Sequence, residues 1–213
     1  MSELLWQKRI RNWAGFLGGV LPFISLLGAY IYSKVTGNIP SNFWSTLSIS
    51  ATYYVTPALV GVLTAASLVL MCYDGYTKVD NLVTTISGVF GLCIVIFPCN
   101  CSVSPEYVGY FQLPVKLSNT LHCASAVIFF CLLAFNALFL FTKTDGSKER
   151  TKQKKIRDII YRVCGIGMLC AMILMPLPIS FFAKTWWIET IALFFFALSW
   201  LVKGGAFKFL NDK

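Results

Sequence analysis

Long stretches without a charged residue alternate with short charged segments along the chain. Five stretches contain no Asp, Glu, Lys or Arg: 12–33, 35–73, 81–105, 117–142 and 163–183. A sixth, 186–202, contains one charge, Glu189. A helix needs about 20 apolar residues to cross a bilayer core of ~30 Å. Each stretch can therefore supply one transmembrane helix.

The pattern predicts an all-α fold, with residues 1–213 forming one domain. This domain is expected to be a polytopic bundle of six transmembrane helices, with spans at about 13–34, 54–73, 81–98, 119–142, 158–178 and 186–203. Helix is expected because lipid offers the backbone no hydrogen-bond partner. The alternating pattern of a barrel strand is absent. Pro22 lies inside the first span and is expected to kink it.

The composition agrees with this prediction. Of the 213 residues, 57% are hydrophobic and 13% are charged, whereas a soluble domain has roughly 25% charged residues. These values exclude a disordered chain, a disulfide-framed secreted module and an ordinary cytosolic enzyme. Six tryptophans lie near predicted membrane interfaces and predict an aromatic belt: Trp6, Trp13, Trp44, Trp186, Trp187 and Trp200.

The basic residues predict the orientation. An even number of spans puts both termini on one side, and 15 of the 18 basic residues then share that side: Lys8, Arg9, Arg11, Lys78, Lys143, Lys148, Arg150, Lys152, Lys154, Lys155, Arg157, Arg162, Lys203, Lys208 and Lys213. The other three are Lys34, Lys116 and Lys184. The positive-inside rule predicts cytoplasmic N and C termini, in a multi-pass protein of the plasma membrane.

Charge also bears on partners. The net charge of +9 is explained by topology, so no nucleic acid is expected as a partner. Membrane lipids are the expected partners, and the basic run 148–157 is expected to contact anionic lipid headgroups. Asp74 and Asp80 flank Lys78 in a predicted cytoplasmic turn, where solvated turn chemistry accounts for both.

Small residues at helical spacing mark places where helices can approach closely. Three pairs have this spacing: Gly15 with Gly19, Gly61 with Ala65, and Gly167 with Ala171. Packing within one chain is the favoured interpretation. Dimerisation is the alternative, although the sequence does not indicate a homo-oligomer.

The chain has eight cysteines, most of them in apolar helix, where Cys behaves as a small hydrophobe. Cys99, Cys101 and Cys123 lie near the predicted outer face. One disulfide, from Cys123 to Cys99 or Cys101, is predicted if that compartment is oxidising. With one His and no C-x-x-C pair, neither a metal site nor a cofactor is predicted.

A polar cluster is predicted at the outer face. The P-loop, G-x-G-x-x-G, G-x-S-x-G and H-E-x-x-H motifs are all absent. The candidate ligand-binding residues are Ser48, Ser50, Tyr53, Tyr54, His122 and Glu189, and the last two are the catalytic candidates because ionisable groups within a membrane are commonly functional. Glu189 is expected to point into the bundle, under a folded-back loop 46–54. The alternative is an interfacial cap without chemistry.

Several segments carry a resemblance to known proteins. They are 47–54, 73–76, 97–98, His122 with 129–130, 138–143, 161–165 and 199–204. Over nearly its whole length the chain resembles a group of bacterial six-span membrane proteins of unknown function. The I-S-x-x-Y run from Ile49 to Tyr53 also resembles DRAM-like (damage-regulated autophagy modulator) six-span proteins, which implies architecture only. Seven-span ceramidase-like hydrolases differ, because this chain has one His and six predicted spans.

Three functions fit these observations. The favoured one is a non-enzymatic membrane protein that binds a lipid or a partner in an outer polar cleft. The second is a membrane-embedded enzyme that modifies a lipid, with His122 as base and Glu189 as its partner. The third is a small transporter or an oligomeric channel, which needs polar residues along a whole path across the membrane.

Overall fold

The computed structural model describes residues 3–37, 40–75, 77–144 and 151–212, and within them the chain is almost entirely helical. The six long helices are α1 (Glu3–Thr36), α2 (Ala58–Met71), α3 (Lys78–Ile96), α4 (Val115–Phe135), α5 (Lys152–Leu174) and α6 (Lys184–Gly204). Shorter elements are the 3₁₀ helices η1 (Ser50–Tyr54) and η3 (Lys208–Leu210), the π-helical η2 (Asn136–Leu140), and the hairpin of β1 (Tyr107–Val108) and β2 (Leu113–Pro114). The all-α class is confirmed.

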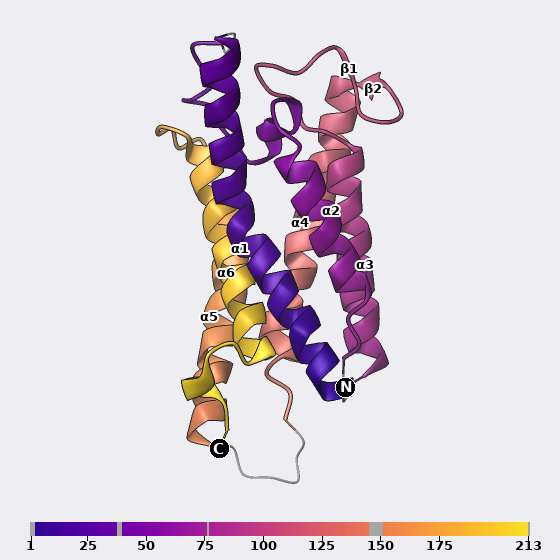
Figure 1. Ribbon diagram of the computed structural model, residues 1–213, viewed down its shortest axis with the longest axis vertical. Coiled ribbons are helices and arrows are strands. Elements are labelled where there is room, and N and C mark those ends of the chain that lie inside the picture. The colour runs from indigo at the N-terminus through magenta and orange to yellow at the C-terminus, as the bar shows by residue number, and fades with distance from the viewer. Residues whose placement is uncertain (1–2, 38–39, 76, 145–150, 213) are drawn as a thin grey trace.

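The helices lie side by side and alternate in direction (Figure 1). Each packs on its neighbours in sequence, and α1 closes the ring by packing on α6. α1 begins and α6 ends at one end of the bundle, here called the proximal end. The opposite, distal end carries η1 and the β1–β2 hairpin. Three of the basic residues used to predict the orientation, Lys148, Arg150 and Lys213, lie outside the described residues.

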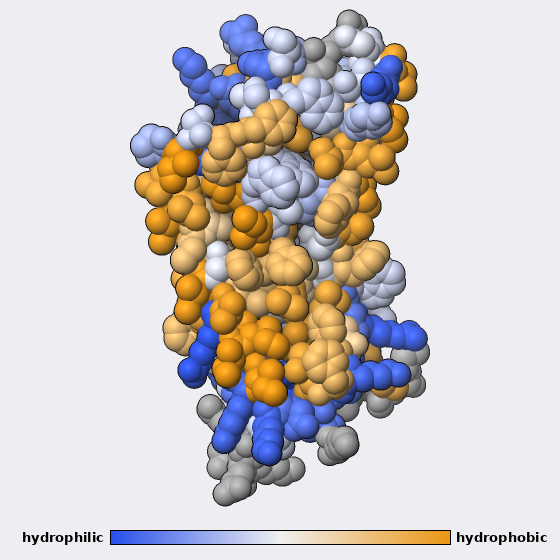
Figure 2. Space-filling view, turned by 90° about the vertical axis from the view of Figure 1, so that its left-hand side faces the viewer, coloured by the Kyte–Doolittle hydropathy of each residue, from blue (hydrophilic) through white to orange (hydrophobic). Residues whose placement is uncertain are grey.

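Four helices are long and apolar enough to cross a membrane: the segments Leu5–Thr36, Lys78–Ile96, Val115–Leu140 and Lys184–Lys203. Figure 2 shows a broad band of hydrophobic side chains between two more polar ends. α2 has 14 residues, about 21 Å at 1.5 Å per residue. The first turns of α5 are basic, which shortens its apolar part.

The second helix begins later than the sequence predicted. A span was expected from residue 54, but α2 begins at Ala58, after Pro57. Proline has no backbone N–H and favours the start of a helix. Residues Ser50–Tyr54 form the separate 3₁₀ helix η1. The polar loop and the second span are therefore two elements.

Small residues bring α1 and α5 close to α6. A Cβ added at Gly15 would lie 2.9 Å from the Ala197 carbonyl oxygen and 3.0 Å from the Leu201 nitrogen. A Cβ at Gly167 would lie 2.3 Å from the Phe195 ring. Packing within the chain is confirmed for these two motifs. Nothing lies within 4 Å of a Cβ at Gly61, so that motif makes no such contact among the described residues.

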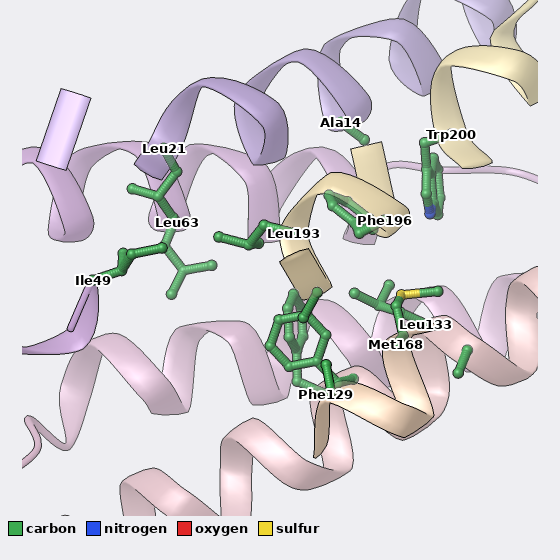
Figure 3. Close-up of a cluster of buried hydrophobic side chains, with 14 of the residues drawn as sticks. Ala14, Leu21, Ile49, Leu63, Phe129, Leu133, Met168, Leu193, Phe196 and Trp200 are labelled. Atoms are coloured by element: carbon green, nitrogen blue, oxygen red, sulfur yellow. The ribbon is translucent and has the colours of Figure 1, made fainter. Parts of the chain in front are cut away.

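Two tryptophans belong to the core and not to the membrane interface. Trp200 is 1% exposed and Trp186 is 7% exposed, so the predicted aromatic belt is wrong for them. Trp200 packs edge-on against the rings of Tyr73 and Phe141. Figure 3 shows Trp200 in the core with side chains from α1, α2, α4, α5 and the distal loop. Trp6, Trp13 and Trp187 are about half exposed, as expected of interfacial anchors.

Candidate functional site

The loop before η1 is attached to the start of α6. The first backbone N–H groups of a helix have no partner within it, and here two of them donate to loop carbonyls. The Ala183 N–H donates to the Ser45 oxygen at 2.9 Å, and the Trp186 N–H donates to the Leu47 oxygen at 3.1 Å. The Ile49 side chain lies in the core near Leu63 (Figure 3). These contacts fix the position of Ser50 at the start of η1.

Glu189 turns into the bundle, as the sequence predicted. One carboxylate oxygen accepts a hydrogen bond from the Ile49 N–H at 2.5 Å. The other accepts one from the Ser50 hydroxyl at 2.9 Å. A carboxylate at membrane depth is costly unless it finds donors of this kind. Glu189 therefore holds the start of η1 against α6.

His122 lies on the other side of Ser50. Its Nδ1 is 2.8 Å from the Phe97 carbonyl oxygen and 3.2 Å from that of Ile94. Carbonyl oxygens only accept hydrogen bonds, so Nδ1 carries a hydrogen. Nε2 lies 3.1 Å from the Ser50 hydroxyl. The ring is 4% exposed, and its orientation is fixed from both sides.

Glu189, Ser50 and His122 therefore form a hydrogen-bonded relay with two proton arrangements. In one, an imidazolium Nε2–H donates to Ser50, and Ser50 donates to the carboxylate. In the other, the carboxyl group donates to Ser50, and Ser50 donates to the neutral ring. Both arrangements hold the same number of protons. The serine can thus pass a proton between the two ionisable groups.

The relay differs from a Ser-His-Asp hydrolase triad. In that triad the carboxylate orients the histidine, and the histidine takes the proton of the serine. Here backbone carbonyls orient His122, and the carboxylate is bonded to Ser50 itself. The arrangement suits proton exchange better than activation of Ser50 as a nucleophile.

The other predicted site residues have separate partners. Ser48 is buried, and its hydroxyl accepts the Ala51 N–H at 2.8 Å, which caps η1. The Tyr53 and Tyr54 rings meet edge-on, 5.1 Å apart. The Tyr54 hydroxyl donates to the Cys99 carbonyl oxygen at 2.6 Å. Hydrogen bonds thus join Ser50, His122 and Glu189, while Tyr54 bonds the end of η1 to Cys99.

Among the described residues, apolar grooves occur near the distal end of the bundle. The larger has a volume of about 470 Å³ and is lined by Tyr53, Val60, Val95, Ile96, Tyr110 and Phe111. The smaller has a volume of about 400 Å³ and is lined by Gly28, Ile31, Tyr32, Val35, Thr36, Val55 and Thr56. The sequence analysis missed Tyr110 and Phe111. An exposed aromatic pair in a short polar loop is the signal that could have identified them.

Cys99 and Cys101 lie two residues apart at this end. Cys99 is buried, Cys101 is partly exposed and Cys123 is exposed, and all eight cysteines are free thiols. Interaction with the Cys99 side chain lowers the pKa of Cys101 to about 7. The backbone N–H groups of Val103 and Ser104 act in the same direction. The disulfide to Cys123 stays a prediction.

The proximal end carries buried ion pairs. Asp80 is 2% exposed, caps α3 in a reciprocal capping box with Thr77, and pairs with Lys143 at 3.1 Å. The interpretation of Asp80 as a solvated turn residue is therefore wrong. Asp158 pairs with Lys154 one turn earlier in α5.

No group of three or more His, Cys, Asp or Glu that could hold a metal ion occurs in the described part of the chain. Comparisons with known protein families, with curated proteins and with solved structures gave no match to this chain.

Proposed function

We propose that this chain is a six-span integral membrane protein of a bacterial plasma membrane, with cytoplasmic termini. Four apolar helices support membrane insertion, and α2 and α5 complete the same ring of packed helices. Among the described residues, twelve Lys and Arg lie toward the proximal end and three toward the distal end. The positive-inside rule then makes the proximal end cytoplasmic.

The distal end binds one membrane lipid, with an acyl chain in the groove of Tyr53, Val60, Val95, Ile96, Tyr110 and Phe111. This groove is the observation that carries the proposal. Its volume of about 470 Å³ lies in the range of ligand pockets, roughly 300–1,000 Å³. Its lining is apolar, apart from the hydroxyls of Tyr53 and Tyr110. At the end of the hydrophobic band, such a groove is open to acyl chains and lies close to their headgroups.

The proximal end contacts anionic lipid headgroups. Lys8, Arg9, Lys152, Lys155 and Arg162 are exposed there. Each Lys or Arg near an anionic surface contributes about 1 kcal/mol. This contact anchors the bundle without selecting one lipid, whereas the distal groove can select by shape.

Lipid retention tests the distal groove. The protein is placed in nanodiscs of phosphatidylethanolamine and phosphatidylglycerol, extracted into detergent, and weighed by native mass spectrometry. The wild type is expected to retain one lipid. Val60→Trp fills the groove and is expected to lower retention about tenfold, equivalent to ~1.4 kcal/mol.

Leu68→Trp is the matched control. Leu68 lies on the same helix, is 50% exposed, and does not line the groove. It should retain lipid like the wild type. Equal retention by Val60→Trp and the wild type, with equal thermal stability, would contradict binding in this groove.

The relay favours a second candidate function, acid–base modification of a lipid headgroup by His122 and Glu189. Their connection through one hydroxyl supports it, because proton transfer needs groups within hydrogen-bond reach or one bridging group. Incubation with the same two phospholipids, followed by lipid mass analysis, tests for a product. Loss of product in His122→Ala, with lipid retention preserved, would support the enzyme. If His122→Ala and Glu189→Gln both keep normal stability, retention and cellular phenotype, the enzyme hypothesis is contradicted.

A further inference from the structure

The segment 99–104 is held in place by side chains from several directions. The Tyr54 hydroxyl donates to the Cys99 carbonyl oxygen at 2.6 Å. The Asn100 N–H donates to the Asn119 side-chain oxygen at 2.8 Å, and the Cys101 N–H donates to the Ser104 hydroxyl at 3.2 Å. A loop fixed in this way presents its side chains in one defined arrangement.

The arrangement makes the two thiols of Cys99 and Cys101 unequal. Cys99 is 7% exposed, so an external molecule cannot readily reach its sulfur. Cys101 lies two residues further along the same loop and is partly exposed. The Ser104 N–H donates to the Cys101 carbonyl oxygen at 3.2 Å, which holds this residue in place. One thiol of the C-x-C pair is therefore accessible from outside, and the other is buried.

We propose that Cys101 and Cys99 are a redox-active thiol pair that exchanges with the disulfide of a partner molecule at the distal face. Cys101 is the attacking thiol and Cys99 is the resolving thiol. This proposal is independent of lipid binding in the groove. It also differs from the predicted structural disulfide to Cys123, since the bridge forms and breaks within the C-x-C pair.

The exchange balances without a further reagent. The Cys101 thiolate attacks one sulfur of a disulfide R–S–S–R′, the S–S bond breaks, and R′S⁻ leaves. The Cys99 thiol gives its proton to R′S⁻, attacks the Cys101 sulfur and releases RS⁻. One internal disulfide is formed, and one external disulfide is reduced to two thiol groups. The distal compartment, external in the proposed orientation, commonly holds disulfides.

Electrostatics agree with these roles. Interaction with the Cys101 side chain raises the pKa of Cys99 well above its usual value. Burial, Cys123 and the Glu189 carboxylate act in the same direction. The attacking thiolate therefore forms at Cys101 near neutral pH, whereas Cys99 keeps its proton until the second step. Burial likewise keeps the nearby Tyr54 phenol protonated by raising its pKa.

Alkylation of the wild-type protein gives the first test. Iodoacetamide reacts with thiolates, so the rate at each cysteine should follow its thiolate fraction. The rate at Cys101 is expected to be half-maximal near pH 7. It should exceed the rate at the more exposed Cys123. Preferential labelling of Cys123 at pH 7 would overturn the proposal.

Exchange with oxidised glutathione gives the second test. The wild type should yield a Cys99–Cys101 disulfide and two reduced glutathiones. Cys99→Ala should stop at a glutathione adduct on Cys101, and Cys101→Ala should show no adduct on Cys99. Cys123→Ala is the matched control and should behave like the wild type. A Cys99–Cys123 or Cys101–Cys123 bridge, or no exchange in the folded wild type, would refute the pair.

Discussion

Asn136 is the most deeply buried side-chain amide among the described residues. It lies in the π-helical turn η2 and is fully buried, and neither amide atom has a hydrogen-bond partner among the described residues. π-Helical turns commonly occur at functional sites. A buried polar group without a partner lowers stability, because its hydration is lost and not replaced.

Asn136→Leu is therefore expected to stabilise the protein. The change keeps a similar volume and removes two unpaired polar atoms, a gain of about 1–3 kcal/mol. Asn81→Leu is the control, since that amide accepts the Gly75 N–H and donates to Asp74. It should destabilise. Thermal unfolding of both variants in the same detergent measures whether each change raises or lowers the stability. Destabilisation by Asn136→Leu would mean that a bound molecule satisfies the amide.

Individual roles at this scale were only partly predictable. His122 and Glu189 stand out in the sequence because ionisable groups are rare in apolar spans. Nothing local distinguishes Ser50, which bridges them, from Ser48, which caps η1. The difference comes from α4 and α6 meeting at η1. The local sequence around Asp80 indicates only a loop residue. Its ion pair is with Lys143, 63 positions away, which local sequence does not reveal.

Among the helices, the close packing of α1 on α6 determines which glycines are needed for two backbones to approach each other. The spacing in the sequence identifies three small-residue motifs equally well. Only the assembled bundle shows that Gly15 faces the backbone of α6, and that Gly61 faces open space. Helix type was predictable from apolar length, whereas η1 and the late start of α2 depend on tertiary contacts.

The same substitution should have opposite effects at these two glycines. Gly15→Ala places a methyl group 2.9–3.0 Å from backbone atoms of α6, so the helices must separate, at a cost of about 1–3 kcal/mol. Gly61→Ala meets nothing and gains roughly 0.5–1 kcal/mol from helix propensity. Thermal unfolding in detergent compares them. Destabilisation by Gly61→Ala would instead indicate a close contact at α2, such as a dimer interface.

At the scale of the whole molecule, buried hydroxyl groups continue beyond the distal site. Ser67, Thr84, Ser87 and Ser125 are buried between the helices. Thr84 and Ser87 donate to carbonyls of their own helix, Asp80 and Val83. Such bonds satisfy a hydroxyl locally. Thr84 and Ser87 are therefore satisfied within α3 and add no link to the relay, whereas the Ser67 hydroxyl has no partner among the described residues.

The proposed orientation gives a final prediction for the whole molecule. Reporter fusions at the C terminus and within the segment 143–157 should report a cytoplasmic position, and a fusion at Glu106 an external one. The physical reason is that moving many Lys and Arg across the membrane is unfavourable, and only Lys34, Lys116 and Lys184 among the described basic residues lie toward the distal end. Glu106 precedes β1 in the distal hairpin segment, so its fusion tests the end that holds Cys101 and the groove. Cleavage within 151–155 by a protease added to intact cells would show that the orientation is the opposite of the proposed one. It would also place the thiol pair in a reducing compartment, where a stable disulfide would not persist.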